Sequence, residues 1–137
     1  MNGAVDFLEK QPGLLAGKLG VMGFCYGGGQ TIQLAAANSK IKAAVPYYGP
    51  VPSAPLKPIE GTNAAIFAVY GALDNRVNGT APALEEAMKK AGKPFDKKQY
   101  ADANHAFNND TGGSYNEAAA VAAWADTLAW FNKHLKG

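Results

Sequence analysis

Two long apolar runs limit what this chain can fold into. Ala43–Tyr48 and Ala64–Tyr70 have the length of β-strands and show little alternation between polar and apolar residues. Such runs are typical of strands that are buried on both faces of a parallel sheet. With the apolar run Leu19–Phe24 and the segment Phe95–Tyr100, they predict about four parallel strands.

Helix-like segments alternate with these strands. The order along the chain is helix, strand, helix, strand, loop, strand, helix, strand, helix. This alternation predicts an α/β fold with right-handed crossovers, in which functional residues follow the strands. The first three helices are expected over residues 2–11, 28–37 and 81–91.

The last helix has both a predicted start and a predicted buried face. Ser114 and Glu117 match the S-x-x-E capping box. Apolar residues at steps of three and four form a stripe that is expected to pack on the sheet, whereas Trp130 lies off the stripe and is expected to be more exposed. The stripe consists of Val121, Trp124, Leu128, Phe131 and Leu135.

Composition excludes several classes of protein. The 137 residues suffice for one domain with one core, and no apolar run is long enough to span a membrane. A net charge of +2 is too small to suggest a nucleic-acid partner. One cysteine and two histidines form no cluster with metal-ligand spacing, so no metal site is expected. The N-terminus does not resemble a signal peptide, and we expect a cytoplasmic protein.

The single cysteine, Cys25, directly follows the first predicted strand. Gly23-Phe24-Cys25-Tyr26-Gly27 fits the G-x-nucleophile-x-G pattern of a strained strand-to-helix turn. We expect side chains at Gly23 and Gly27 to collide in such a turn, and Gly28 to let the helix pack closely on the sheet. The alternative is a small buried thiol, since free cysteine is often buried.

The same turn has two further expected properties. The positive end of the following helix favours the thiolate of Cys25, and the backbone N–H of Tyr26 is a candidate oxyanion donor. Because no Lys-Ser/Thr follows the glycines, a phosphate-binding loop is not expected.

Two other residues with catalytic chemistry follow later strands. Asp74 could orient a histidine, or it could simply begin the next helix. His105 could act as a base, or it could be an ordinary surface residue. Together with Cys25 they give the order nucleophile, acid, histidine, which is the order of the α/β-hydrolases. The three therefore support one another as a Cys25–His105–Asp74 triad.

The motifs G-F-C-Y-G-G at 23–28, Y-G-A-L-D at 70–74 and Y-A-D-A-N-H-A-F at 100–107 resemble those of dienelactone hydrolases (carboxymethylenebutenolidases). The resemblance covers nearly the whole chain. It implies the triad above, no metal, no organic cofactor, and hydrolysis of a lactone or small ester through a thioester acyl-enzyme.

In that family further strands precede the nucleophile turn, so residues 1–137 are expected to form a single, truncated α/β-hydrolase domain. Leu19–Phe24 should then be an exposed apolar edge, which predicts a homodimer or swapped assembly that covers it. The alternative to an active hydrolase is a weak or inactive remnant that serves as a binding or assembly module.

The resemblance also bears on the substrate. The family enzyme that acts on dienelactone holds the substrate carboxylate with arginines, one of them shortly after the histidine. This chain has Phe107-Asn108-Asn109-Asp110 there, and its only arginine is Arg76. Dienelactone itself is therefore not the expected substrate, and Phe107 and Arg76 are the candidate substrate-binding residues.

Overall fold

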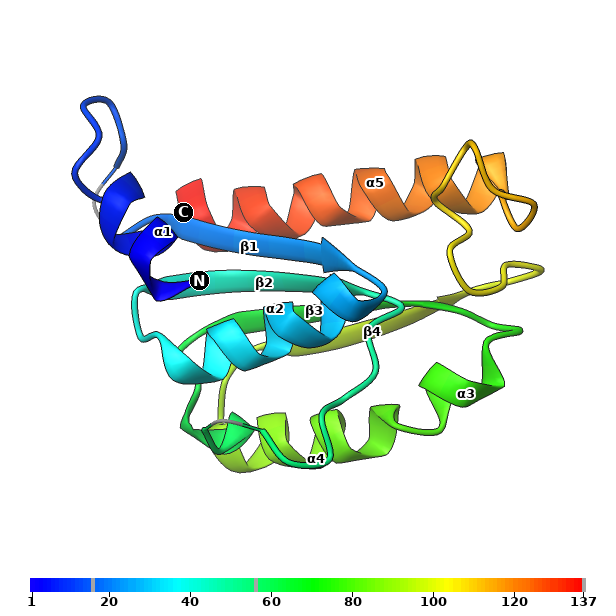
Figure 1. The fold of residues 1–137 in the computed structure, drawn as a ribbon, viewed down its shortest axis with the longest axis horizontal. Coiled ribbons are helices and arrows are strands. Elements are labelled where there is room, and N and C mark those ends of the chain that lie inside the picture. The colour runs from blue at the N-terminus through cyan, green and yellow to red at the C-terminus, as the bar shows by residue number, and fades with distance from the viewer. Residues whose placement is uncertain (16, 56, 137) are drawn as a thin grey trace.

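The strands form one parallel sheet in the order β1-β2-β3-β4 (Figure 1). The computed structural model describes residues 1–15, 17–55 and 57–136. The bounds of β1 and β4 agree with the prediction, and those of β2 and β3 differ from it by one or two residues. The strands are β1 (Leu19–Phe24), β2 (Ile41–Tyr47), β3 (Ala65–Gly71) and β4 (Phe95–Tyr100).

Helices cover both faces of the sheet, which confirms the α/β class. Helix α5 (Glu117–Phe131) lies on one face, and α2 (Tyr26–Ala37) and α4 (Ala81–Ala91) lie on the other (Figure 1). The first helix is shorter than predicted, and α2 begins two residues earlier. No helix in the described part of the chain is long and apolar enough to cross a membrane. The remaining elements are α1 (Asn2–Leu8), η1 (Ile59–Gly61), α3 (Asn75–Asn78) and η2 (Asn132–Lys136).

The central strands contribute to two separate cores. Ala44 and Ile66 pack with residues of α2 and α4, whereas Val45 and Phe67 pack with residues of α5. Successive strand residues point to opposite faces of a sheet, so a strand covered on both sides is apolar throughout. This explains why β2 and β3 show no polar alternation.

The predicted buried face of α5 is wrong over most of its length. Val121, Trp124 and Leu128 are 64%, 48% and 44% exposed. The helix instead turns small residues toward the sheet, namely Ala119, Ala120, Ala123 and Thr127. Small side chains allow the helix to approach the sheet closely. The prediction failed because apolar residues lie on both sides of the helix, so their spacing did not indicate which side is buried.

Trp130 lies on the face of α5 that packs on the sheet, opposite to the prediction. Its ring is 5.7 Å from that of Phe67 between centroids, and its Nε1–H donates to the Ala65 carbonyl at 3.3 Å. A ring that fills a half-buried position and finds an acceptor for its N–H is well suited to this interface.

The helix also begins differently from the predicted capping box. Asn116 is the N-cap, and its Oδ1 accepts from Ala119 N–H at 3.0 Å. Glu117 is the first helical residue, so Ser114 lies too far upstream to cap the helix. Asparagine is as good a cap as serine, and the chain uses the nearer one.

The predicted exposed edge is confirmed only in part, since Leu19 is buried and Val21, Met22 and Gly23 are half-buried. Among the described strands β1 pairs only with β2, and both Gly20 and Phe24 on it are exposed. Helix α5 and the following turn extend along this side, since a Cβ on Gly20 would lie 2.9 Å from Leu135 and Phe131. The β1 edge and the exposed stripe of α5 thus leave an apolar region uncovered.

Candidate active site

Cys25 occupies a strained turn between β1 and α2. Its φ of 53° lies in the left-handed region, which costs a non-glycine residue about 1–3 kcal/mol. Cys25 N–H donates to the Tyr47 carbonyl at 3.1 Å, and the Cys25 carbonyl accepts from Gly28 N–H at 2.9 Å. Tyr26 begins α2, and the first N–H groups of a helix have no acceptor within it. The turn therefore holds the thiol beside a backbone donor.

The glycines around the cysteine have different roles. A Cβ on Gly23 would lie 2.3 Å from the Gly27 carbonyl oxygen and 2.7 Å from Thr31 Oγ1. A Cβ on Gly28 would lie 2.6 Å from the Tyr47 carbonyl oxygen, which confirms close packing of α2 on the sheet. The collision predicted for Gly27 is wrong, because a Cβ there would meet no described atom within 4 Å outside its own helix.

Asp74 fulfils both of the roles that the sequence left open. It is the N-cap of α3, where Oδ1 accepts from Val77 N–H at 3.2 Å. Its second oxygen, Oδ2, lies 2.5 Å from His105 Nδ1. The carboxyl group is buried, so the cap fixes its orientation and directs the other oxygen at the histidine.

The loops after β3 and β4 approach each other closely at Gly71. A Cβ there would lie 2.6 Å from the Ala103 carbonyl oxygen and 2.7 Å from that of Asn104. Leu73 N–H donates to the Ala103 carbonyl at 2.9 Å. Gly71 thus lets the Asp74 loop and the His105 loop meet. The sequence carried this signal in Y-G-A-L-D, but its meaning required the partner loop.

An open cavity of about 330 Å³ lies at the cysteine turn. Ala106, the neighbour of His105, lines it, so the turn and the histidine loop share one space. The ring of Tyr48 also lines it and meets the His105 ring edge-on, with 5.1 Å between centroids. The lining consists of Phe24, Cys25, Tyr48, Ala106, Asn108 and Asn109.

Sequence reasoning missed Tyr48. The residue directly follows β2, so the rule that functional residues follow strands applied to it as well. Its φ of 36° lies in the left-handed region, like those of the cavity-lining residues Cys25 and Ala106.

The two candidate substrate-binding residues are placed differently. Phe107 is completely buried and packs against Tyr48 with 5.5 Å between ring centroids, so it supports the cavity wall instead of lining it. Arg76 is exposed on α3, and its charge acts on the Cys25 thiol. Of the two, only Arg76 has a side chain that a bound molecule could reach.

The thiol of Cys25 is protonated at neutral pH, although the start of α2 was expected to favour the thiolate. Burial raises the pKa of Cys25 above its ordinary value of 9.0, the Arg76 charge lowers it, and the Asp74 charge raises it. Because the balance is a raised pKa, the thiol needs a base before it can act as a nucleophile.

Alkylation should report this protonation state directly, because Cys25 is the only thiol in the chain. We expect iodoacetamide to react slowly at pH 7 and faster as the pH rises past 9, since a raised pKa delays thiolate formation. Arg76→Gln should move the profile to higher pH because it removes a charge that lowers the pKa of Cys25. A rate already at its plateau at pH 7 would contradict a protonated thiol.

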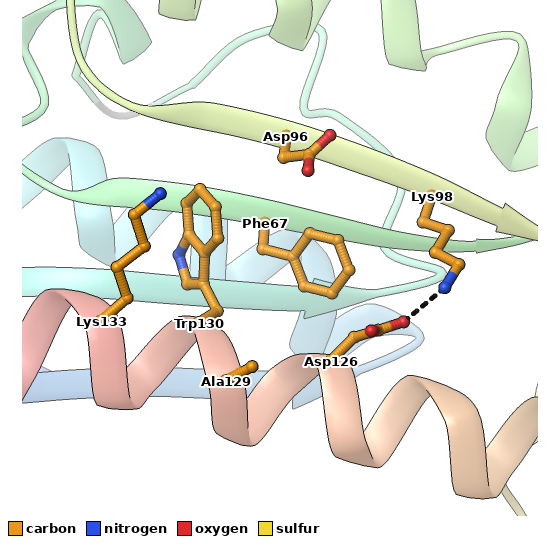
Figure 2. Close-up of a pocket in the computed structure, with 7 residues that line it drawn as sticks. All are labelled: Phe67, Asp96, Lys98, Asp126, Ala129, Trp130 and Lys133. Carbon is orange, nitrogen blue, oxygen red and sulfur yellow. Dashed lines mark hydrogen bonds and ion pairs between the residues drawn. The ribbon is translucent and has the colours of Figure 1, made fainter.

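A second cavity, of about 350 Å³, lies between α5 and the sheet (Figure 2). Phe67 and Trp130 form its apolar wall, and the ion pair of Lys98 with Asp126, at 2.7 Å, lies at one end. Neither thiol nor imidazole lines it. We therefore assign the candidate active site to the slightly smaller cavity at Cys25.

The parallel sheet, the strained cysteine turn and the Asp–His pair at the carboxyl edge define this chain as part of an α/β-hydrolase. The model of the dienelactone hydrolase family matches residues 1–135. The chain belongs to the dienelactone hydrolase family.

Individual relatives agree with this assignment. A protein of Escherichia coli O157:H7 named "Putative carboxymethylenebutenolidase" is 34% identical over 126 residues, which cover 85% of this chain and 46% of the relative. A Bradyrhizobium sp protein named "Probable 2-oxo-3-(5-oxofuran-2-ylidene)propanoate lactonase" is 30% identical over an alignment that covers 100% of this chain and 59% of that protein.

A solved structure shows the same partial coverage. The "Putative Dienelactone Hydrolase" from Klebsiella pneumoniae superposes with a TM-score of 0.85 at 32% identity, over 97% of this chain and 59% of that chain. This chain thus spans about half the length of the relatives that it matches.

Proposed function

We propose that this chain hydrolyses small esters or lactones with Cys25 as nucleophile, His105 as base and Asp74 as the residue that orients the histidine. The observation that carries the proposal is the 2.5 Å contact between His105 Nδ1 and Asp74 Oδ2. A carboxylate at Nδ1 holds the proton on that nitrogen and leaves the Nε2 lone pair available as a base. Cys25 lies on the cavity that the histidine loop shares.

The reaction divides into two acyl transfers. His105 Nε2 takes the thiol proton while sulfur adds to the carbonyl carbon, and the C=O π electrons move onto oxygen. When the carbonyl re-forms, the C–O bond to the leaving group breaks, and the imidazolium returns its proton to the departing oxygen. Water, deprotonated by Nε2, then hydrolyses the thioester and restores the thiol. The raised pKa of Cys25 makes the base essential in the first step.

Three features support a small carbonyl substrate. The open cavity offers space for a compact acyl group beside the thiol. Tyr26 begins α2, so its N–H has no acceptor within the helix and is the candidate donor to the oxyanion. Relatives named as lactonase and carboxymethylenebutenolidase make lactones the first class to test, and the exposed Arg76 would favour acyl groups that carry a carboxylate.

The proposal is tested with para-nitrophenyl esters and simple lactones. Wild type should hydrolyse them, and Cys25→Ala should fall to the background rate, with an unchanged melting temperature as the control for folding. Arg76→Gln should raise KM for a carboxylate-bearing ester but not for its neutral analogue. Equal rates in wild type and Cys25→Ala would remove Cys25 from the mechanism.

A second candidate is a binding or assembly module that retains the triad without useful turnover. Its support is that the chain spans about half the length of its relatives. Inactivity of both wild type and Cys25→Ala, in proteins that melt cooperatively, would favour this candidate.

We also propose that a homodimer covers the β1 edge. An edge strand offers unpaired backbone groups, and the neighbouring stripe of α5 exposes Val121, Trp124 and Leu128. Light scattering at micromolar concentration should give twice the chain mass of 14.3 kDa. A single-chain mass under those conditions would contradict the dimer.

A further inference from the structure

The backbone of Tyr48 is held in an unusual conformation beside Cys25. With φ at 36°, it adopts the left-handed region that a bulky residue rarely occupies. Its N–H donates to the Val69 carbonyl of β3 at 2.7 Å, which anchors the residue to the sheet. Such strain persists only where the surrounding structure enforces it, and it is concentrated at functional sites.

Neighbouring rings fix the side chain of Tyr48. It is 2% exposed, and its ring lies 5.5 Å from that of Phe107, 5.1 Å from that of His105 and 6.1 Å from that of Phe24, between centroids. These contacts leave the ring little freedom to reorient. The little exposed surface that remains faces the cavity that Cys25 lines.

The hydroxyl group of Tyr48 keeps its proton and is able to donate it in a hydrogen bond. Burial is the main cause that raises the pKa of Tyr48, and the nearby Cys25 and Tyr47 raise it further. The Asn108 backbone partly opposes this rise. A protonated phenol retains its O–H as a hydrogen-bond donor.

We propose that the Tyr48 hydroxyl donates a hydrogen bond, in addition to that of Tyr26 N–H, to the oxyanion that forms when Cys25 attacks a carbonyl. This inference rests on the proposed function. When the Cys25 sulfur adds to the carbonyl carbon, negative charge develops on the oxygen in the shared cavity. A rigid donor on the cavity wall stabilises that charge without reorganisation.

Tyr48→Phe tests the inference because it removes only the hydroxyl oxygen. We expect kcat for ester hydrolysis to fall about 10²-fold, while KM and the pH profile of Cys25 alkylation stay unchanged. Tyr100→Phe is the matched control. It removes a hydroxyl that donates to Asp126 Oδ2 at 2.6 Å and does not line the cavity, so its kcat should stay near that of wild type.

A trifluoromethyl ketone separates this inference from the proposed function, because the thiol adds to it to give a stable tetrahedral oxyanion without turnover. Tyr48→Phe should weaken its binding about 10²-fold, and Tyr100→Phe should leave it unchanged. If wild type binds the ketone in this Tyr48-dependent manner but hydrolyses nothing, the donor is supported and turnover is refuted. Tyr48→Phe within twofold of wild type in both assays, or a wild type that adds no ketone, would overturn the role of Tyr48.

Discussion

Asp74→Asn is expected to lower kcat for ester hydrolysis about 10⁴-fold while changing stability little. The asparagine carbonyl can still accept from Val77 N–H and so keep the cap of α3. Its amide group, however, presents N–H to His105 Nδ1, which favours the tautomer with its proton on Nε2 and removes the base. The Asp74 charge raises the pKa of Cys25, so its loss favours the thiolate and cannot explain a slower reaction.

Asp110→Asn is the matched control for this charge change. Asp110 is exposed on the segment that follows His105. It should keep kcat within about twofold of wild type, since an exposed charge contributes little. Steady-state kinetics and thermal melts of both variants make the comparison. Wild-type kcat in Asp74→Asn would show that the His105–Asp74 contact has no catalytic role.

Gly23→Ala is expected to destabilise the fold by about 1–3 kcal/mol or more. The added Cβ would lie 2.3 Å from the Gly27 carbonyl oxygen, so the start of α2 must move away from β1. This movement would also displace Cys25, and hydrolysis should fall even at temperatures where the protein is folded. Denaturant unfolding gives the loss of free energy, and assays well below the melting temperature give the loss of activity.

Gly27→Ala provides the opposite expectation in the same turn. A Cβ there meets no described atom within 4 Å outside its own helix, and alanine favours the helix over glycine by up to about 1 kcal/mol. We therefore expect Gly27→Ala to be neutral or stabilising. Equal destabilisation by both substitutions would contradict the packing of the turn described above.

Much of the fold could be predicted because local signals agreed with the tertiary structure. Uniformly apolar strands indicated a sheet that is covered on both faces. The polar and reactive residues that follow the strands indicated the carboxyl edge of that sheet. Helix α5 could not be predicted in the same way. Either its stripe of large apolar residues or its alanine face could pack against the sheet. The helix lies close to the sheet, and only the small alanine side chains fit between them.

For the site, the chain order predicted that Cys25, Asp74 and His105 act together, but several properties of these residues depend on contacts between distant segments. The two oxygens of Asp74 serve different partners, and the pKa of Cys25 results from burial, Arg76 and Asp74 together. Tyr48 reaches the site through a φ of 36° that the sequence does not reveal.

The central claim is that Cys25 carries the acyl group. Intact-mass analysis tests this claim most directly, on protein that is quenched in acid while it turns over a para-nitrophenyl ester. We predict a mass increase of one acyl group, located on the peptide that contains Cys25 and absent from Cys25→Ala. Acylation of another residue, or hydrolysis that persists in Cys25→Ala, would contradict the claim.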